Sequence, residues 1–186
     1  MKGTFSTEIG LLGIWDSASM SFVKTPDDGM KYMVGDASFA DHMTKGFGVF
    51  WGTGGDGTYD VDIRVGMDAS LTDEEKRIIE MKAENMKLVV TGDKAYIGSP
   101  EYVGFAESEG LMQKRISIVQ GLQTGTYAVD AYFIYDGEAE EKMDDMSREE
   151  VLALPEGFDK TGFVVLVKPV DASHEFPQKI FLPTLG

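Results

Sequence analysis

A six-residue segment occurs twice in this chain, and this repetition constrains the fold more than any other feature. Gly57-Thr-Tyr-Asp-Val-Asp62 returns as Gly125-Thr-Tyr-Ala-Val-Asp130. Both copies begin with glycine, a frequent turn residue, and continue with apolar and polar side chains in alternation. That alternation is the pattern of a half-buried β-strand. The repetition therefore predicts one β-rich unit that is used twice.

The similarity extends upstream of the repeated strand. Tyr32–Phe39 and Ala95–Tyr102 each contain an apolar pair, a glycine, small or polar residues and then an aromatic residue. The apolar segments Gly48–Trp51 and Ile116–Val119 follow, each before a glycine-bearing turn. We expect each copy to end in an acidic helix.

The length of the chain fits one domain built from these two units. It has 186 residues, of which 42% are hydrophobic, so a real interior is expected rather than disorder. We predict a single domain over residues 1–186, with pseudo-repeats at about residues 30–86 and 94–155.

The alternation also predicts how each strand is covered. In the first copy the expected polar face comprises Asp60, Asp62 and Arg64. In the second copy both faces are largely apolar, which indicates a strand nearer the centre of its sheet. Gly162–Lys168 is an unbroken apolar run and predicts a further interior strand.

Two capping boxes, in which a Ser or Thr precedes a Glu by three residues, predict helix starts. Thr72 and Glu75 predict a helix that runs to about Asn85, and Ser147 with Glu150 predicts a short helix. A hairpin is expected between them, with strands at 87–90 and 94–97. The predicted fold class is α+β: an antiparallel β-rich domain built from two similar halves with a few short helices.

The glycine-rich segment Gly52–Gly57 superficially resembles a phosphate-binding loop. No Lys-Ser or Lys-Thr pair follows it, Asp56 would repel phosphate, and the next predicted element is a strand instead of a helix. A hairpin loop is the better interpretation.

Net charge restricts the classes of partner. The 32 acidic and 17 basic residues give a formal charge of −15, which argues against nucleic-acid binding because phosphate contacts need clustered Lys and Arg. The excess fits either a basic protein partner or a generally acidic surface. There are no cysteines, so thiolate chemistry and disulfides are excluded, and the sequence shows no cofactor or metal motif. We expect a cytoplasmic protein without membrane segments, because the apolar run at residues 9–15 is too short to cross a bilayer.

Three aspartates are candidate ligand-binding residues. If the two units pack about a pseudo-twofold axis, Asp62 and Asp130 approach each other, and Asp60 and Trp51 lie near them. Paired carboxylates suit acid–base chemistry or a hard cation such as calcium. The alternative is that all three are solvated strand residues, and that Trp51 belongs to the core.

The segment at residues 136–150 is a candidate partner-binding surface. It contains eight acidic and two basic side chains. It is either a docking face for a basic partner or a mobile loop that enters a charged helix. The candidate residues are Glu138, Glu140, Glu141, Asp144 and Asp145.

The two histidines do not indicate a hydrolase. Asp41 and His42 supply two members of a Ser-His-Asp triad, but no Gly-x-Ser-x-Gly motif accompanies them.

Residues 88–100 and the later Gly125-Thr-Tyr-Ala-Val129 strand resemble uncharacterised bacterial β-rich families with a repeated Gly-x-Tyr-x-Val unit. Some of these families are interpreted as immunity proteins, which bind and neutralise toxins. Ser99 stands where the pattern prefers Asp, and the resemblance brings no catalytic residues.

These features predict a non-enzymatic, immunity-like module that binds another protein through an acidic surface. The alternative is a small-molecule binder or hydrolase-type enzyme with a carboxylate-lined pocket between the repeats. A homo-oligomer is also possible, because exposed sheet edges favour pairing.

Overall fold

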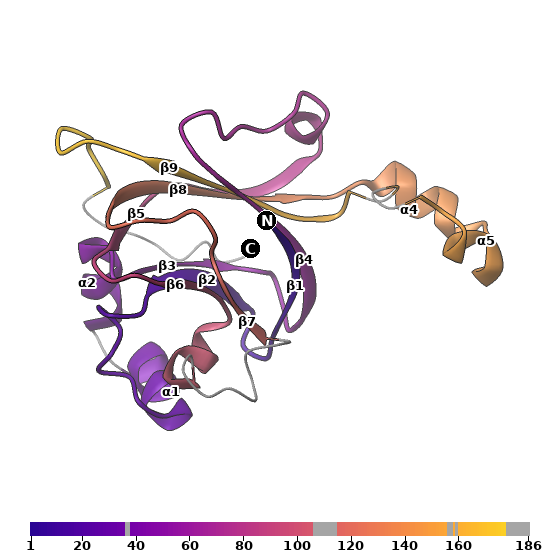
Figure 1. Ribbon diagram of the computed structural model, residues 1–186. Coiled ribbons are helices and arrows are strands. Elements are labelled where there is room, and N and C mark those ends of the chain that lie inside the picture. Colours follow the sequence, from indigo (N-terminus) through magenta and orange to yellow (C-terminus); the bar gives the residue numbers. More distant parts are fainter. Residues whose placement is uncertain (36–37, 106–114, 156–157, 159, 178–186) are drawn as a thin grey trace.

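The computed structural model describes residues 1–35, 38–105, 115–155, 158 and 160–177. Two β-sheets pack face to face, and short helices lie at the periphery (Figure 1). The predicted α+β, β-rich class is confirmed.

The larger sheet has five strands in the order β1-β4-β9-β8-β5. All neighbours are antiparallel except β4 and β9, which run parallel. Its strands are β1 (Lys2–Thr7), β4 (Gly57–Val65), β9 (Gly162–Pro169), β8 (Gly125–Ile134) and β5 (Ile79–Val90).

The smaller sheet has four antiparallel strands in the order β3-β2-β6-β7. These strands are β3 (Gly48–Gly52), β2 (Leu11–Asp16), β6 (Ala95–Gly98) and β7 (Ile116–Ile118).

The helices lie in two separate regions (Figure 1). Those that cover the outer face of the smaller sheet are α1 (Pro26–Gly35), α2 (Ser38–Lys45) and the 3₁₀ helix η2 (Pro100–Phe105). The others, α4 (Gly137–Asp144) and α5 (Arg148–Leu152), extend away from the two sheets. No helix in the described part of the chain is long and apolar enough to cross a membrane.

The main core fills the space between the two sheets. Both inner faces contribute fully buried aliphatic side chains, among them Ile14, Leu88, Val129 and Val165. A second apolar cluster joins the smaller sheet to its helices, and a third lies on the outer face of the larger sheet. Apolar burial of this extent is the main force that stabilises a sandwich.

The strand predictions from alternation are confirmed. Val61 and Ile63 are buried in β4, whereas Asp62 and Arg64 are partly exposed on the other face. Strand β8 is buried on both faces between β9 and β5, and β9 is the central strand of the sheet.

The predicted helix from Thr72 to Asn85 is wrong. The capping-box contacts form, since the Glu75 amide donates to Thr72 Oγ1 and the Thr72 amide donates to Glu75 Oε2. They open only one 3₁₀ turn, η1 (Glu75–Arg77), before β5 begins. The alternating side chains of β5 pair with β8 over nearly its whole length, and this tertiary contact outweighs the local helix signal. The capping box at Ser147 does open a helix, α5.

Both predicted hairpins are wrong for one reason. Strands β5 and β6 follow each other in the sequence but belong to different sheets, and so do β3 and β4. The turns at residues 91–94 and 53–56 therefore cross from one sheet to the other, because each sheet of the sandwich pairs strands that are distant in sequence.

Some of the segments aligned in the proposed repeat have the same secondary structure, and others do not. The repeated Gly-Thr-Tyr segments are both strands of the larger sheet, β4 and β8. Upstream, residues 32–35 end helix α1 while residues 95–98 form strand β6, so this part of the alignment is wrong. Residues 36–37 and 106–114, within the two predicted units, lie outside the described residues. The division into two similar halves stays a prediction.

Gly13 in β2 allows the chain to approach β3 closely, and its replacement tests the packing of the smaller sheet. A Cβ atom at this position would lie 2.2 Å from Phe50 Cδ1 and 2.4 Å from the Val49 carbonyl oxygen. We expect Gly13→Ala to reduce the free energy of unfolding by about 2 kcal/mol in urea denaturation, because backbone must shift. Gly55→Ala is the control, because no atom lies within 4 Å of its added Cβ. Equal stability of the two variants would contradict the close approach.

Candidate binding site

A pocket of about 430 Å³ opens on the outer face of the larger sheet. We call it the outer-face pocket. Its buried apolar floor includes Ile134 and Val164. Charged side chains surround this floor, namely Lys2, Asp60, Asp62, Arg64, Glu75 and Lys160.

Gly162 accounts for the hollow in the pocket floor. Its φ is +152°, which side chains rarely adopt, and an added Cβ would lie 2.6 Å from the Asp60 carbonyl oxygen. The sheet therefore carries no side chain at this point between β4 and β8.

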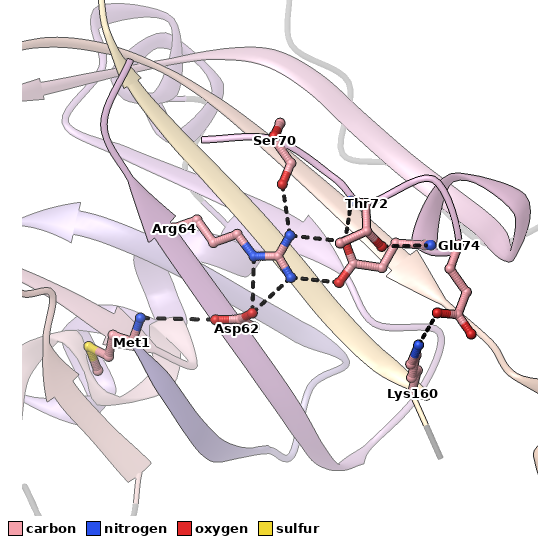
Figure 2. Close-up of polar contacts among 8 residues, drawn as sticks. Met1, Asp62, Arg64, Ser70, Thr72, Glu74 and Lys160 are labelled. Carbon is pink, nitrogen blue, oxygen red and sulfur yellow. Dashed lines mark hydrogen bonds and ion pairs between the residues drawn. The ribbon is translucent and has the colours of Figure 1, made fainter. Parts of the chain in front are cut away.

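Arg64 is the centre of the polar network beside the pocket (Figure 2). Its Nε and Nη2 donate to Asp62 Oδ2 at 3.0 and 2.9 Å. Its Nη1 and Nη2 donate to Glu75 Oε2 and Oε1 at 2.9 and 2.5 Å, a bidentate pair. Nη1 also donates to the Ser70 carbonyl oxygen at 2.7 Å.

This network fixes the protonation state of Glu75. The hydrogen bonds from Arg64 lower the pKa of the Glu75 carboxyl to about 2, against the opposing effect of burial. The pKa of Arg64 is raised, chiefly by its hydrogen bonds to Glu75. Both groups are therefore charged at neutral pH, and Glu75 is unsuited to act as a general acid or base there.

The network also holds the segment between β4 and β5 against the sheet. Arg64 belongs to β4, whereas Ser70 and Glu75 belong to this segment. Apolar residues of the same segment and the first residue of β5 pack on Tyr132, Ile134, Val164 and Leu166. They are Ala69, Leu71 and Ile78 of the segment and Ile79 of β5. Of this segment, Glu75 lines the outer-face pocket beside Arg64.

The remaining charges at the pocket differ in their partners. Lys160 pairs with Glu74, and the Met1 amine lies 4.0 Å from Asp62 Oδ1 (Figure 2). Asp60 is exposed and its Oδ1 accepts a hydrogen bond of 2.7 Å from Thr4 Oγ1. Among the described residues, Asp60 forms no ion pair.

Asp60 and Asp62 thus line the same pocket, but Asp130 does not belong to it. Strand β9 separates β4 from β8, and Asp62 lies level with Tyr132, two residues from Asp130. Standard strand spacings place the Asp62 and Asp130 Cα atoms about 12 Å apart, too far to share a proton. Asp130 Oδ1 instead accepts the Asn85 amide at 2.8 Å, where β5 bulges.

Trp51 does not line the outer-face pocket, because its side chain lies in the core between the two sheets. It is 1% exposed and packs beside Phe163, with ring centroids 6.2 Å apart. Its indole Nε1–H has no acceptor in the described part of the chain. Trp51 thus lies where the core alternative expected it, and it does not line the outer-face pocket.

All five predicted acidic residues are exposed. Glu138, Glu140, Glu141 and Asp144 lie on α4, and Asp145 follows it. We call residues 136–152 the acidic arm; it extends from the body of the molecule (Figure 1). Its first helix, α4, is capped by Asp136, whose side chain accepts the Ala139 amide at 3.1 Å.

The two histidines lie outside the pocket lining. His42 Nδ1 bonds to Tyr32 Oη at 2.7 Å among aromatic rings, and His174 Nε2 bonds to Asn85 Oδ1 at 2.7 Å. In the described residues, neither histidine forms a hydrogen bond with a serine. These contacts therefore do not support a Ser-His-Asp triad. In the same residues no group of three or more His, Asp or Glu side chains is placed to hold a metal ion.

Sequence reasoning did not single out Arg64, Gly162 or Lys160 as site residues. One signal for Arg64 was its position as the cation on the polar face of β4, two residues from Asp62. Gly162 stood at the start of an apolar run, where its backbone conformation was not readable.

Comparisons with known proteins give little similarity. No protein-family model matches the chain, and no curated protein matches it. A solved structure described as "Crocagin biosynthetic gene J" aligns at 12% sequence identity with a TM-score of 0.49. That alignment covers 91% of this chain and 98% of the other.

Replacing Glu75 tests the Arg64 network through its pH dependence. The folded-state pKa of about 2 lies below the ordinary 4.5, so this stabilisation is complete above 4.5 and is lost as pH falls toward 2. Between about pH 6 and about pH 2.5 the wild type should lose about 2–3 kcal/mol more unfolding free energy than Glu75→Gln. Urea denaturation at both values measures this, and parallel losses would show that Arg64 does not hold Glu75 ionised.

The unpaired indole of Trp51 predicts an unusual substitution series. Trp51→Phe loses contact area but removes a buried donor without an acceptor, so its unfolding free energy should stay within about 1 kcal/mol of the wild type. Trp51→Ala should lose about 3–5 kcal/mol because it leaves a cavity. Urea denaturation compares them, and a loss for Phe as large as that for Ala would mean that the indole N–H makes a stabilising bond.

Proposed function

We propose that this protein is a non-enzymatic binding module whose acidic arm docks on a basic surface of a partner protein. The observation that carries the proposal is the placement of five exposed carboxylates on an arm that extends from the sandwich. The arm has eight acidic and two basic side chains between residues 136 and 150, a net charge of −6.

Concentrated charge of this kind favours a cationic partner. The total charge of the chain is −15, so the arm carries a large part of it in one short segment. A field of one sign raises the rate of encounter with an oppositely charged protein and repels copies of the same chain. A homo-oligomer joined through the arms is therefore disfavoured.

The arm also presents apolar surface that a partner would cover. Leu152 in α5 is 76% exposed, and Met143 and Met146 are partly exposed. Protein interfaces commonly place apolar contacts at their centre and charged contacts at the rim. An immunity-like role, in which the arm covers a basic face of a toxin, is one form of this function.

The chemistry of the outer-face pocket supports a binding role over catalysis. Asp62 and Glu75 both accept hydrogen bonds from Arg64, and neither histidine lines the pocket. A small-molecule binder remains the second candidate, favoured by the size of the pocket, about 430 Å³, and by its mixed charges. In that case the pocket lies on the outer face of the larger sheet, with lining residues from both repeated strands, β4 and β8.

Neutralising the arm tests the main proposal. The variant E138Q/E140Q/E141Q/D144N/D145N should bind a nona-arginine peptide at least about tenfold more weakly than the wild type in calorimetric titration, because several carboxylate contacts are lost. Wild-type binding should weaken strongly between about 0.05 and about 0.5 M salt, since exposed charges are screened.

A second variant controls for net charge. D27N/D41N/D56N/D68N/D93N removes the same number of charges from exposed positions outside the arm. It should retain most of the wild-type affinity for the peptide. If both variants weaken binding equally, the arm is not the docking surface and the peptide responds only to total charge.

A further inference from the structure

We propose that the outer-face pocket receives an arginine side chain of the basic partner, an inference that rests on the proposed function. The guanidinium would pair with Asp60, and its aliphatic stem would lie over the apolar floor of the pocket. The pocket and the acidic arm would then form one continuous interface.

The position of the pocket joins it to the arm. Ile134, on the pocket floor, ends β8 just before the arm, and Lys160–Gly162 follow the arm and lead into β9. We call the chain on either side of the arm, at residues 134–136 and 160–162, its two stems. The Asp136 amide donates to Thr161 Oγ1 at 3.1 Å and so connects the two stems. A protein that lies along the arm is therefore within reach of the pocket.

The shape of the pocket suits a long side chain with an apolar stem. Ile134 and Val164 are 4% and 3% exposed and form an apolar floor. Gly162 leaves the space between them and Asp60 without a side chain. Arginine buries its methylene groups on such surfaces and keeps its charged end beside polar groups.

The charges at the pocket leave Asp60 as the available anion. Arg64 forms ion pairs with both Asp62 and Glu75, while Lys160 is paired with Glu74. Asp60 accepts a bond from Thr4 at one oxygen and retains free acceptor positions for a guanidinium. Lys2, which also lines the pocket, opposes a bound cation.

Arginine fits this site better than lysine does. A planar guanidinium donates several hydrogen bonds in a fixed geometry that matches a carboxylate, and it loses less hydration energy than an ammonium group. Buried arginine side chains are also frequent in the residues that dominate binding energy at interfaces.

The minimal probe is N-acetyl-L-arginine amide, in which the side chain carries the only charge. Titration followed by NMR should shift the backbone amide signals of Asp60, Gly162 and Val164. The neutral analogue N-acetyl-L-glutamine amide should leave them unchanged. Equal shifts with both probes, or none with either, would overturn the proposal.

Removing the negative charge of Asp60 and removing the positive charge of Lys2 should change the affinity for the arginine probe in opposite directions. Asp60→Asn should weaken binding of the arginine probe about tenfold, and Lys2→Gln should strengthen it about two- to threefold. Asp56→Asn, which removes one exposed carboxylate outside the pocket, should have no effect. Thermal unfolding of each variant confirms that it is folded. An unchanged affinity in Asp60→Asn would overturn the proposal.

The two proposals fail separately. The five-residue arm variant should still bind the single-arginine probe, because none of its substitutions lines the pocket. If nona-arginine requires the arm but the single-arginine probe never binds, the arm proposal stands and the pocket proposal falls. If the single-arginine probe binds at Asp60 but arm neutralisation does not affect nona-arginine, the proposed docking function falls.

Discussion

The bridge from Arg64 to Asp62 and Glu75 is the interaction on which the outer face of the larger sheet depends. It connects β4 to the segment before β5, and the apolar side chains of that segment then cover Tyr132 and Leu166. A partly buried guanidinium is stable only when its hydrogen bonds are met, and here two carboxylates and a carbonyl meet them. The bridge thus holds Glu75 in the lining of the pocket and engages the Asp62 and Glu75 carboxylates in hydrogen bonds.

The sandwich gives the acidic arm a rigid base. Its two stems continue from β8 and into β9, the neighbouring strands at the centre of the larger sheet. Both strands are almost fully buried, and the bond from Asp136 to Thr161 closes the stems. An interface held on such a base loses less conformational entropy on binding than a mobile loop does. The fold therefore places a charged, partly apolar surface at a defined position.

The sequence predicted local features better than it predicted partners in space. Alternation identified β4 and β8 because a half-buried strand imposes it directly. The capping box at Thr72 formed, yet strand pairing with β8 ended its helix after one turn, which no local signal could reveal. Asp60 and Asp62 both line the outer-face pocket. Asp130 is separated from them by β9, a strand that is distant in sequence. Trp51 was ambiguous because a tryptophan suits both a core and a pocket.

Hydrogen–deuterium exchange of the protein, alone and with nona-arginine, tests the central claim most directly. Bound peptide should slow exchange in α4 and α5 and also at the two stems, around residues 134–136 and 160–164, because one ligand would cover both surfaces. Exchange in α1 and α2, which cover the other sheet, should stay unchanged. Protection confined to α1 and α2, or no protection at the stems and the arm, would contradict the account.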